Sequence, residues 1–298
     1  MAIKKTKFKI YLYIVISMVC WSFSFIWTRT GLESFQPITL ISLRLILASI
    51  FLYIFAKISG KFIRIEKKDL KIFILLAFFE PFMYYVGETY GLTRVEPTLA
   101  SVIISTIPVF APIFAFVFLG EKISILNFIG IALSILGVFL VVYKPDGSTP
   151  TDLKGIALLL LAVLSSIGYT IILRKIPEKY SATNIVFYQS LISLLFFIPT
   201  FLIVDFPSIH QLKISADSIQ ALLLLTIFAS VIAFVLFADA VRLIGVARTQ
   251  IFVNLIPVFT AVFSWILLHE YLNIIQWLGI LVVIFGLFIS QRRKAKKS

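Results

Sequence analysis

The sequence predicts an all-α integral membrane protein with ten transmembrane helices, built as two inverted five-helix repeats. Three observations lead to this prediction: an apolar composition, ten long hydrophobic runs, and an internal repeat. Of the 298 residues, 60% are hydrophobic and only 14% are charged, whereas an ordinary soluble domain carries about 25% charged residues. The composition therefore excludes a water-soluble enzyme, and the single cysteine excludes an internal disulfide scaffold.

The hydrophobic residues form runs of the length that a membrane requires. A bilayer core about 30 Å thick needs about 20 apolar residues per helix. The runs lack the period-two alternation of barrel strands, so helices are the favoured way to satisfy their backbone groups in lipid. The loops between them are too short for a soluble domain. In chain order the predicted spans are 10–29, 37–57, 70–92, 97–119, 125–143, 153–173, 183–204, 217–241, 246–268 and 274–291.

The basic residues behind the net charge of +13 fall unequally on the two sides of the predicted membrane. With the N-terminus in the cytoplasm, 21 of the 27 Lys and Arg residues fall on the cytoplasmic side and 5 on the other. This positive-inside bias predicts that both termini are cytoplasmic and that the number of spans is even. A nucleic-acid partner is excluded, because no soluble module is present to carry a basic binding surface.

The second half of the chain repeats the first. A shift of 149 residues aligns 107–139 with 256–288 without a gap, and 13 of the 33 positions are identical. We therefore expect one five-helix repeat over 10–143 and a second over 153–291. Because five is odd, the second repeat enters the membrane from the opposite side. Inverted repeats are a recurring architecture of secondary transporters, in which similar halves exchange inward-facing and outward-facing states.

The repeated motif resembles the EamA family of the drug/metabolite transporter superfamily. The pattern Pro108, Gly120-Glu121, Gly130 and Gly137 recurs as Pro257, Glu270, Gly279 and Gly286, with Trp21, Arg44 and Tyr90-Gly91-Leu92 in the positions that the family favours. One departure is His269, which stands where the first repeat has Gly120. The resemblance covers about 10–291 and implies a ten-helix carrier of the bacterial inner membrane, commonly an exporter of amino acids or other small metabolites.

Ionisable residues inside the predicted spans are candidates for the transport pathway, because each is costly to insert into a membrane. Glu80, Tyr84 and Glu88 are spaced by four residues and so lie on one helix face. Arg44 lies at a similar depth in the preceding span. We expect Arg44 to bind a substrate carboxylate, and Glu80 or Glu88 to bind an amine or exchange a proton. The alternative is a structural ion pair between Arg44 and Glu88.

Two prolines occupy matching places in the two halves, Pro108 in the fourth span and Pro257 in the ninth. Interruptions at repeat-related positions indicate a binding site near the bilayer midplane. A packing kink is the alternative. Ser105 and Asn254, which also correspond between the repeats, are predicted to line the cavity.

Aromatic and polar residues of other spans complete the predicted cavity. Trp21 is expected to stack on a substrate cation or ring. Tyr169, Tyr188 and Gln189 are expected at the corresponding inner positions of the second half, with Gln189 aligned on Arg44. The two halves would therefore be chemically unequal.

No cofactor or metal site is predicted. His210 and His269 are too isolated for a catalytic metal site, and the chain has no phosphate-binding loop for ATP. The expected partners are a small-molecule substrate and membrane lipid. The glycine pairs, Gly130 with Gly137 and Gly279 with Gly286, are consistent with a monomer or with a homodimer.

The sequence thus favours a non-enzymatic secondary carrier that exports amino acids or similar small metabolites by alternating access, with proton coupling as an option. A multidrug carrier of lipophilic cations is the main alternative, since Glu80 and the aromatic residues suit a cation. A membrane enzyme or a channel would require clustered acids or a continuous polar stripe, and the sequence shows neither.

Overall fold

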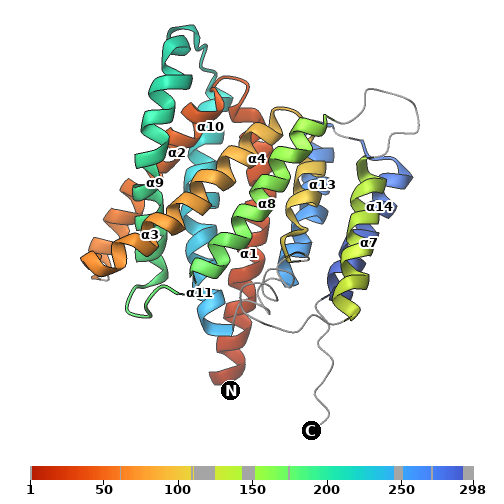
Figure 1. Cartoon of the computed structure of the whole chain (residues 1–298), viewed down its shortest axis with the longest axis horizontal. Helices are drawn as coiled ribbons and strands as arrows, with labels where there is room; N and C mark the ends of the chain where they lie inside the picture. Colours follow the sequence, from red (N-terminus) through yellow and green to blue (C-terminus); the bar gives the residue numbers. More distant parts are fainter. Residues whose placement is uncertain are drawn as a thin grey trace.

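The architecture comes from a computed structural model that describes residues 2–60, 62–108, 110, 125–142, 152–173, 175–244, 251–269 and 271–290. Gly120, Glu121 and Glu270 of the repeated motif lie outside these residues. The described secondary structure is entirely helical (Figure 1). The first half contains α1 (Ala2–Gly31), α2 (Pro37–Ile58), η1 (Lys67–Asp69), α3 (Leu70–Ala77), η2 (Phe78–Met83), α4 (Tyr84–Leu92), α5 (Pro97–Ile104) and α7 (Ile125–Val142).

The second half begins with the same order of elements, from α8 to α11. It contains α8 (Leu153–Leu173), α9 (Ala182–Val204), η3 (Phe206–Gln211), α10 (Ala216–Leu224), η4 (Leu225–Ala233), α11 (Phe234–Ile244), η5 (Ile251–Leu255), α13 (Ile256–Leu268) and α14 (Ile274–Ser290). Of these, η1, η3 and η5 are 3-10 helices, whereas η2 and η4 are π-helical.

Six of the predicted spans are long and apolar enough, as described, to cross a membrane, which identifies a membrane protein. The other four predicted spans, 97–119, 125–143, 246–268 and 274–291, appear as shorter apolar helices or reach outside the described residues. The count of ten helices therefore remains a prediction. The six long spans are Ile10–Gly31, Pro37–Ile58, Lys67–Leu92, Leu153–Leu173, Ala182–Val204 and Ala216–Ala240.

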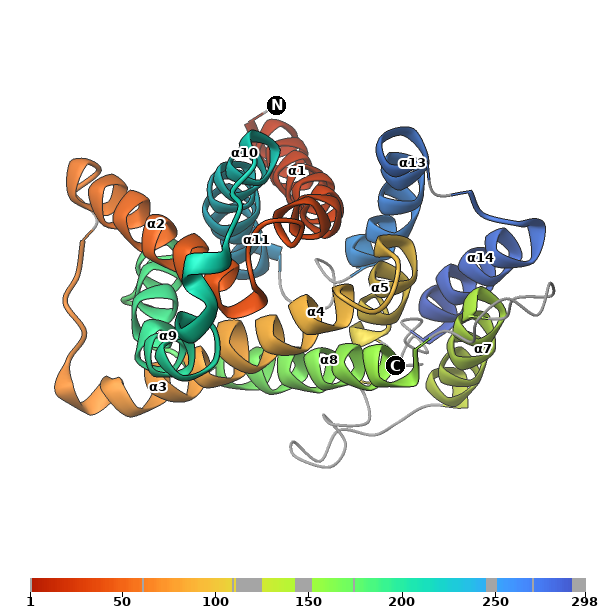
Figure 2. The ribbon, with the colours of Figure 1, turned by 90° about the horizontal axis from the view of Figure 1, so that it is seen from above.

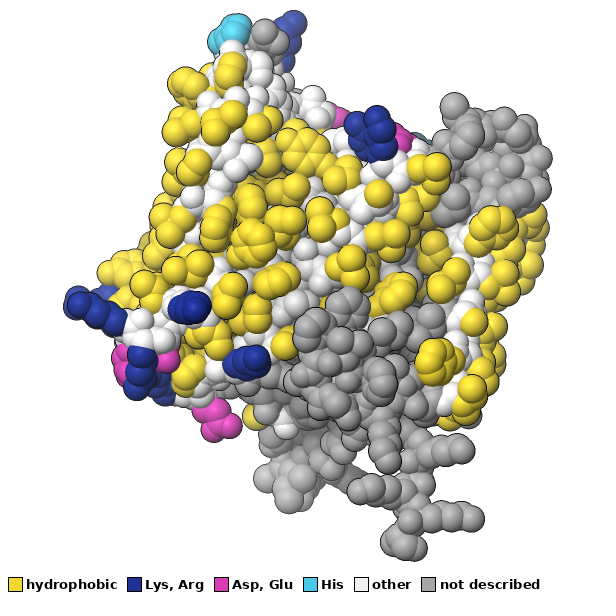
Figure 3. All heavy atoms as spheres, viewed as in Figure 1, with side chains coloured by type: hydrophobic (Ala, Val, Ile, Leu, Met, Phe, Trp, Pro, Cys, Tyr) yellow, Lys and Arg dark blue, Asp and Glu magenta, His cyan; other side chains and the backbone are white. Residues whose placement is uncertain are grey.

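The helices form a bundle whose centre combines elements of both halves (Figure 2). α2 packs on α9, α4 on α8, and α1 on α13 and on the span that contains η4. α7 and α14 lie side by side at one end of the bundle in both views. The described part of the face seen in Figure 3 is largely apolar, with Lys and Arg gathered toward its ends, as expected for lipid-facing helices.

Two long spans are interrupted by π-helical turns at matching places. η2 covers residues 78–83 and η4 covers 225–233, so their first residues are 147 positions apart. In η2 the break coincides with Pro81, which has no N–H to donate, and Glu80 has an extended backbone (φ −145°, ψ 121°). η4 contains no proline. Such π-turns are frequent at functional sites.

Small residues bring α7 and α14 together. A Cβ on Gly137 would lie 2.7 Å from the carbonyl oxygen of Gly279, and one on Gly279 would lie 2.8 Å from the carbonyl oxygen of Gly137. Only glycine permits this backbone approach. This contact within the chain accounts for Gly137 and Gly279 without a second copy.

A left-handed residue ends α13. His269 follows Leu268 with φ 54° and ψ 32°, a conformation that glycine adopts most easily. The first repeat has Gly120 at the aligned position. The departure from the family motif at His269 therefore falls on a helix end where the backbone itself favours glycine.

Charged groups hold the helix ends together. At one end, Arg94 pairs with Asp152 at 2.7 Å, and this hydrogen bond lowers the pKa of the Asp152 carboxyl. At the other end, Lys179 pairs with Glu66 at 2.6 Å and with Asp69 at 2.7 Å. Hydrogen bonds from Lys179 and Lys68 lower the pKa of Glu66. These contacts join the third span to the segments before α8 and α9.

Candidate functional site

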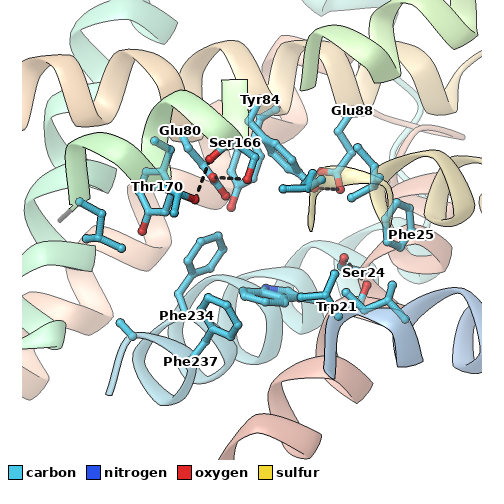
Figure 4. Close-up of a pocket in the computed structure, with 18 of the residues that line it drawn as sticks. Trp21, Ser24, Phe25, Glu80, Tyr84, Glu88, Ser166, Thr170, Phe234 and Phe237 are labelled. Atoms are coloured by element: carbon cyan, nitrogen blue, oxygen red, sulfur yellow. Dashed lines mark hydrogen bonds between the residues drawn. The ribbon is translucent and has the colours of Figure 1, made fainter. Parts of the chain in front are cut away.

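A cavity of about 90 Å³ lies in the centre of the bundle (Figure 4). A buried water needs roughly 10–15 Å³ by this measure, so the cavity has room for several waters or for a compact small molecule. Both halves of the chain contribute to its wall. The lining residues are Trp21, Ser24, Phe25, Arg44, Glu80, Tyr84, Tyr85, Glu88, Ile104, Ile107, Ser166, Tyr169, Thr170, Leu173, Phe234, Phe237, Ala238, Val253 and Ile256.

Arg44 is the cation of the cavity wall among the described residues. Its side chain is only 4% exposed. Nε donates a hydrogen bond to the hydroxyl of Ser230 at 2.5 Å, and Cζ lies 4.3 Å from the ring centre of Tyr85. The guanidinium is therefore held at one edge by a hydroxyl and on one face by an aromatic ring.

Glu88 lies on the same wall and has a tyrosine partner. The hydroxyl of Tyr84 donates to Glu88 Oε1 at 3.2 Å. The four-residue spacing predicted that these side chains share a face, and Figure 4 shows both at one side of the cavity. Glu88 is 5% exposed, so its carboxyl is shielded from bulk water.

Glu80 reaches the cavity from the break in the third span. Its extended backbone interrupts the helix, and its carboxyl Oε2 accepts a hydrogen bond from the Ser166 hydroxyl at 3.3 Å. Thr170, one turn along α8, donates to the carbonyl of Ser166. The break therefore places a buried carboxyl against the hydroxyl-bearing face of α8.

The ion pair between Arg44 and Glu88, proposed above as a structural alternative, is not made. Within the described residues these two side chains do not approach within 4 Å, and Arg44 bonds to Ser230 instead. A charge that binds a neutral hydroxyl keeps its electrostatic attraction for a ligand. Arg44 therefore joins α2 to η4 through Ser230 rather than α2 to α4 through Glu88.

Aromatic rings form the wall opposite Glu80. Trp21 lies 5.2 Å from Phe234 and 4.8 Å from Phe237, measured between ring centres, and Figure 4 shows the three rings together across the cavity from Glu80. Indole Nε1 of Trp21 donates to the carbonyl of Ala229 at 3.3 Å. Trp21 is thus fixed against η4, with its ring at the cavity.

The structure gathers six of the residues predicted from the sequence at this cavity, namely Trp21, Arg44, Glu80, Tyr84, Glu88 and Tyr169.

Four other predictions fall elsewhere or cannot be placed. Ser105 is buried but donates to the carbonyl of Val102. Tyr188 donates to the carbonyl of Ile63 at 3.0 Å, toward the loop after α2. Gln189 contacts the cavity only through Tyr169, whose hydroxyl donates to it at 3.4 Å. The side chain of Asn254 lies outside the described part of the structure.

Both prolines follow breaks in helical structure. α5 ends at Ile104, two turn residues come before Pro108, and the 3-10 helix η5 precedes Pro257 at the start of α13. Pro257 and Pro108 themselves do not line the cavity, although Ile107 and Ile256 beside them do.

Several residues of the wall were not predicted. Tyr85, Ser166, Thr170 and Phe234 line the cavity, and Ser230 binds Arg44 just behind it. Small hydroxyl residues are common in membrane helices and bond readily to backbone carbonyls. In the sequence, nothing distinguishes Ser166 or Ser230 from Ser17 or Ser22, which are also serines within apolar runs.

The described residues contain no group of three His, Cys, Asp or Glu side chains that is suited to a metal ion. The cavity offers one guanidinium and two carboxyls that are buried, together with several hydroxyls and an aromatic wall.

Comparison with known proteins identifies the kind of protein. The sequence model of the EamA-like transporter family matches residues 8–143 and 153–291. The chain is 28% identical to the uncharacterized transporter YetK of Bacillus subtilis (strain 168) over 256 residues, covering 85% of this chain and 77% of YetK. It is 27% identical to an uncharacterized transporter of Archaeoglobus fulgidus over 296 residues, covering 96% and 98% of the two chains.

A solved crystal structure has a similar fold. It superimposes with a TM-score of 0.70 over 94% of this chain and 95% of its own length, at 13% sequence identity. At this identity the similarity bears on the fold alone.

Proposed function

The chain belongs to the EamA-like transporter family, and we propose that it is a secondary transporter that exports amino acids or similar small metabolites by alternating access with proton coupling. In this proposal ten spans form two inverted repeats, the protein lies in the bacterial inner membrane, and both termini are cytoplasmic. It acts as a monomer or homodimer.

The observation that carries the proposal is the central cavity. It is enclosed by elements of both halves and combines Arg44, Glu80 and Glu88 with an aromatic wall. Buried ionisable groups in a membrane protein are costly unless they serve a pathway or are paired. Arg44 has no acidic partner within 4 Å in the described residues, which supports a ligand as its partner.

Matching contacts support the inverted repeat. Ser166 of α8, in the second half, donates a hydrogen bond to Glu80 in η2 of the first half; Trp21 of α1, in the first half, donates one to the carbonyl of Ala229 in η4 of the second half. Ser166 is 145 positions after Trp21, close to the offset of 147 between η2 and η4. The first helix of each half therefore forms a hydrogen bond with the π-helical segment of the other half. Two such halves can exchange their arrangements across the membrane.

The arrangement of charges suits a zwitterion. A guanidinium binds a carboxylate through two parallel hydrogen bonds, so we assign the substrate carboxylate to Arg44. A buried carboxyl accepts an ammonium group or a proton, and we assign this exchange to Glu80. The rings of Trp21, Phe234 and Phe237 would cover an apolar side chain.

Purified protein in liposomes tests the proposal. Vesicles loaded with one unlabelled amino acid at a time should accumulate the labelled form by counterflow for at least one member of the panel. An inward or outward pH gradient should then change the direction of net flux. Vesicles that exchange no amino acid and no other carboxylate would contradict the proposal.

A carrier of lipophilic cations is the second candidate, favoured by one specific observation. The cavity wall holds two carboxyls for one guanidinium, together with aromatic rings that attract cations. The same vesicles, loaded with tetraphenylphosphonium, separate the two functions. Exchange of this cation without exchange of any zwitterion would establish the second candidate in place of the first.

A further inference from the structure

Ser230 is a buried serine on the π-helical segment η4, only 3% exposed, and its hydroxyl accepts the Nε–H of Arg44. We propose that Ser230 is a positioning residue, which fixes the guanidinium of Arg44 so that its two terminal amino groups bind the carboxylate of the substrate. This inference rests on the proposed function, because it assigns a specificity determinant to the same cavity.

Two contacts fix the plane of the guanidinium. Ser230 holds the Nε edge at 2.5 Å, and the Tyr85 ring covers one face at 4.3 Å. A planar group that is held at one edge and on one face has little rotational freedom left. The long arginine side chain otherwise loses considerable rotamer entropy when it binds a ligand, so prior fixation favours binding.

The opposite edge of the guanidinium is left free. Within the described residues neither Nη1 nor Nη2 of Arg44 has a hydrogen-bond partner, although the residue is 4% exposed and lines the cavity. Since the residue lines the cavity, these amino groups are available to a ligand there. A carboxylate offers two oxygens at the spacing of this fork and satisfies both amino groups at once.

The segment that carries Ser230 is itself fixed by the first helix. Trp21 donates to the carbonyl of Ala229, and the hydroxyl of Ser17 donates to the carbonyl of Ala233 at 3.0 Å. Three side chains from α1 and α2 thus bond to one π-helical segment. The position of Ser230 is therefore set by contacts with α1, and Arg44 takes its direction from Ser230.

The described residues of the other half show no equivalent arrangement. The residue 147 positions before Ser230 is Met83, which has no hydroxyl, and Gln189, aligned on Arg44, bonds to Tyr169. The carboxylate subsite is therefore expected on one side of the cavity only, between α2 and η4.

The test compares a transported amino acid with its amide, which keeps the ammonium group and the side chain but lacks the carboxylate. Counterflow in liposomes would be measured for the wild type, for Ser230→Ala, Ser230→Thr and Arg44→Gln, and for the double variant that combines Arg44→Gln with Ser230→Ala. Ser193→Ala is the matched control, because Ser193 is a fully buried serine of α9 that bonds only to the carbonyl of Ser190 in the described structure.

We expect Ser230→Ala to raise KM for the acid by about tenfold, in line with the loss of one hydrogen bond to a charged group, while KM for the amide and both kcat values change less than about twofold. Ser230→Thr, which keeps the hydroxyl, should restore most of the affinity for the acid. In the Arg44→Gln background the Ser230→Ala change should add nothing, because the group it positions is gone.

Equal losses for the acid and the amide in Ser230→Ala, or no loss for either, would overturn this inference while leaving the proposed function intact. A wild type that exchanges tetraphenylphosphonium but neither acids nor amides would overturn the proposed function and, with it, the carboxylate subsite. Purified Ser230→Ala should unfold within a few degrees of Ser193→Ala, which separates a positioning effect from misfolding.

Discussion

The two π-helical segments beside the cavity differ in how they arise and in what they present. In η2 the turn surrounds Pro81, and the side chain of Glu80 reaches the cavity from the break. In η4 there is no proline and no charge, and the segment offers the carbonyl of Ala229 and the hydroxyl of Ser230. The breaks occupy matching places, yet one supplies a carboxyl and the other supplies contacts that orient residues of α1 and α2.

This difference shows how a duplicated backbone can become a directional site. If the first half carries the titrating and charged groups and the second half positions them, the two sides of the cavity differ chemically. The arrangement of the helices need not change for this difference to arise. Substitutions at equivalent places in the two halves should therefore have unequal effects on transport but similar effects on folding.

The largest effect is expected from Glu80→Gln. If the η2 carboxyl exchanges the proton, this variant should lose uphill transport driven by a pH gradient, by about a hundredfold or to background, while counterflow between equal pools persists. Transport into everted vesicles checks this, with Glu96→Gln as the control at an exposed acid. Full retention of pH-driven accumulation would remove Glu80 from the coupling role.

A smaller effect on affinity should distinguish Arg44 from its counterpart. Arg44→Gln should raise KM for a carboxylate substrate by about 30-fold, roughly 2 kcal/mol, because it removes a charged bidentate partner. Gln189→Ala should change KM by less than about threefold, since Gln189 contacts the cavity only through Tyr169. Similar KM increases in both variants would show that the halves share the binding.

Folding should respond alike in the two halves. Gly137→Leu and Gly279→Leu each place a side chain against the carbonyl oxygen of the other glycine. We expect each to destabilise the protein by about 1–3 kcal/mol through overpacking, measured by thermal unfolding in detergent. Leu281→Ala, at a site on α14 that is 59% exposed, is the control. A large loss in only one glycine variant would contradict the reciprocal contact.

The smallest effect concerns pH and the ion pair outside the membrane. The hydrogen bond from Arg94 lowers the pKa of Asp152 below its ordinary value of 3.8. A depressed carboxyl pKa gives stability that is present above the unfolded pKa and is lost as the pH falls through the folded one. Arg94→Gln should therefore lower the unfolding temperature slightly at pH 6 and have no effect well below pH 3.8. The two groups are 42% and 35% exposed, so the change should be small.

The amino-acid sequence was a good guide to the long helices and a weaker guide to the site. The predicted spans 70–92 and 153–173 coincide with the observed helical segments, because hydrophobic length alone decides them. Arg44, Glu80 and Glu88 stood out because charge is rare in such spans. Pro81 coincides with the first break, whereas η4 has no proline and contacts α1 through Trp21 and Ser17. Ser230 and Ser166 were missed because buried serines are common in membrane helices.

The central claim is that substrate occupies this cavity and reaches it from one side of the membrane at a time. A single cysteine tests it most directly: Ser166→Cys, on the cavity wall, in a Cys20→Ser background. With a membrane-impermeant thiol reagent, we predict that labelling from either face of the membrane is slowed at least about tenfold by a saturating transported amino acid. Labelling from both faces at rates that no substrate changes would contradict the account.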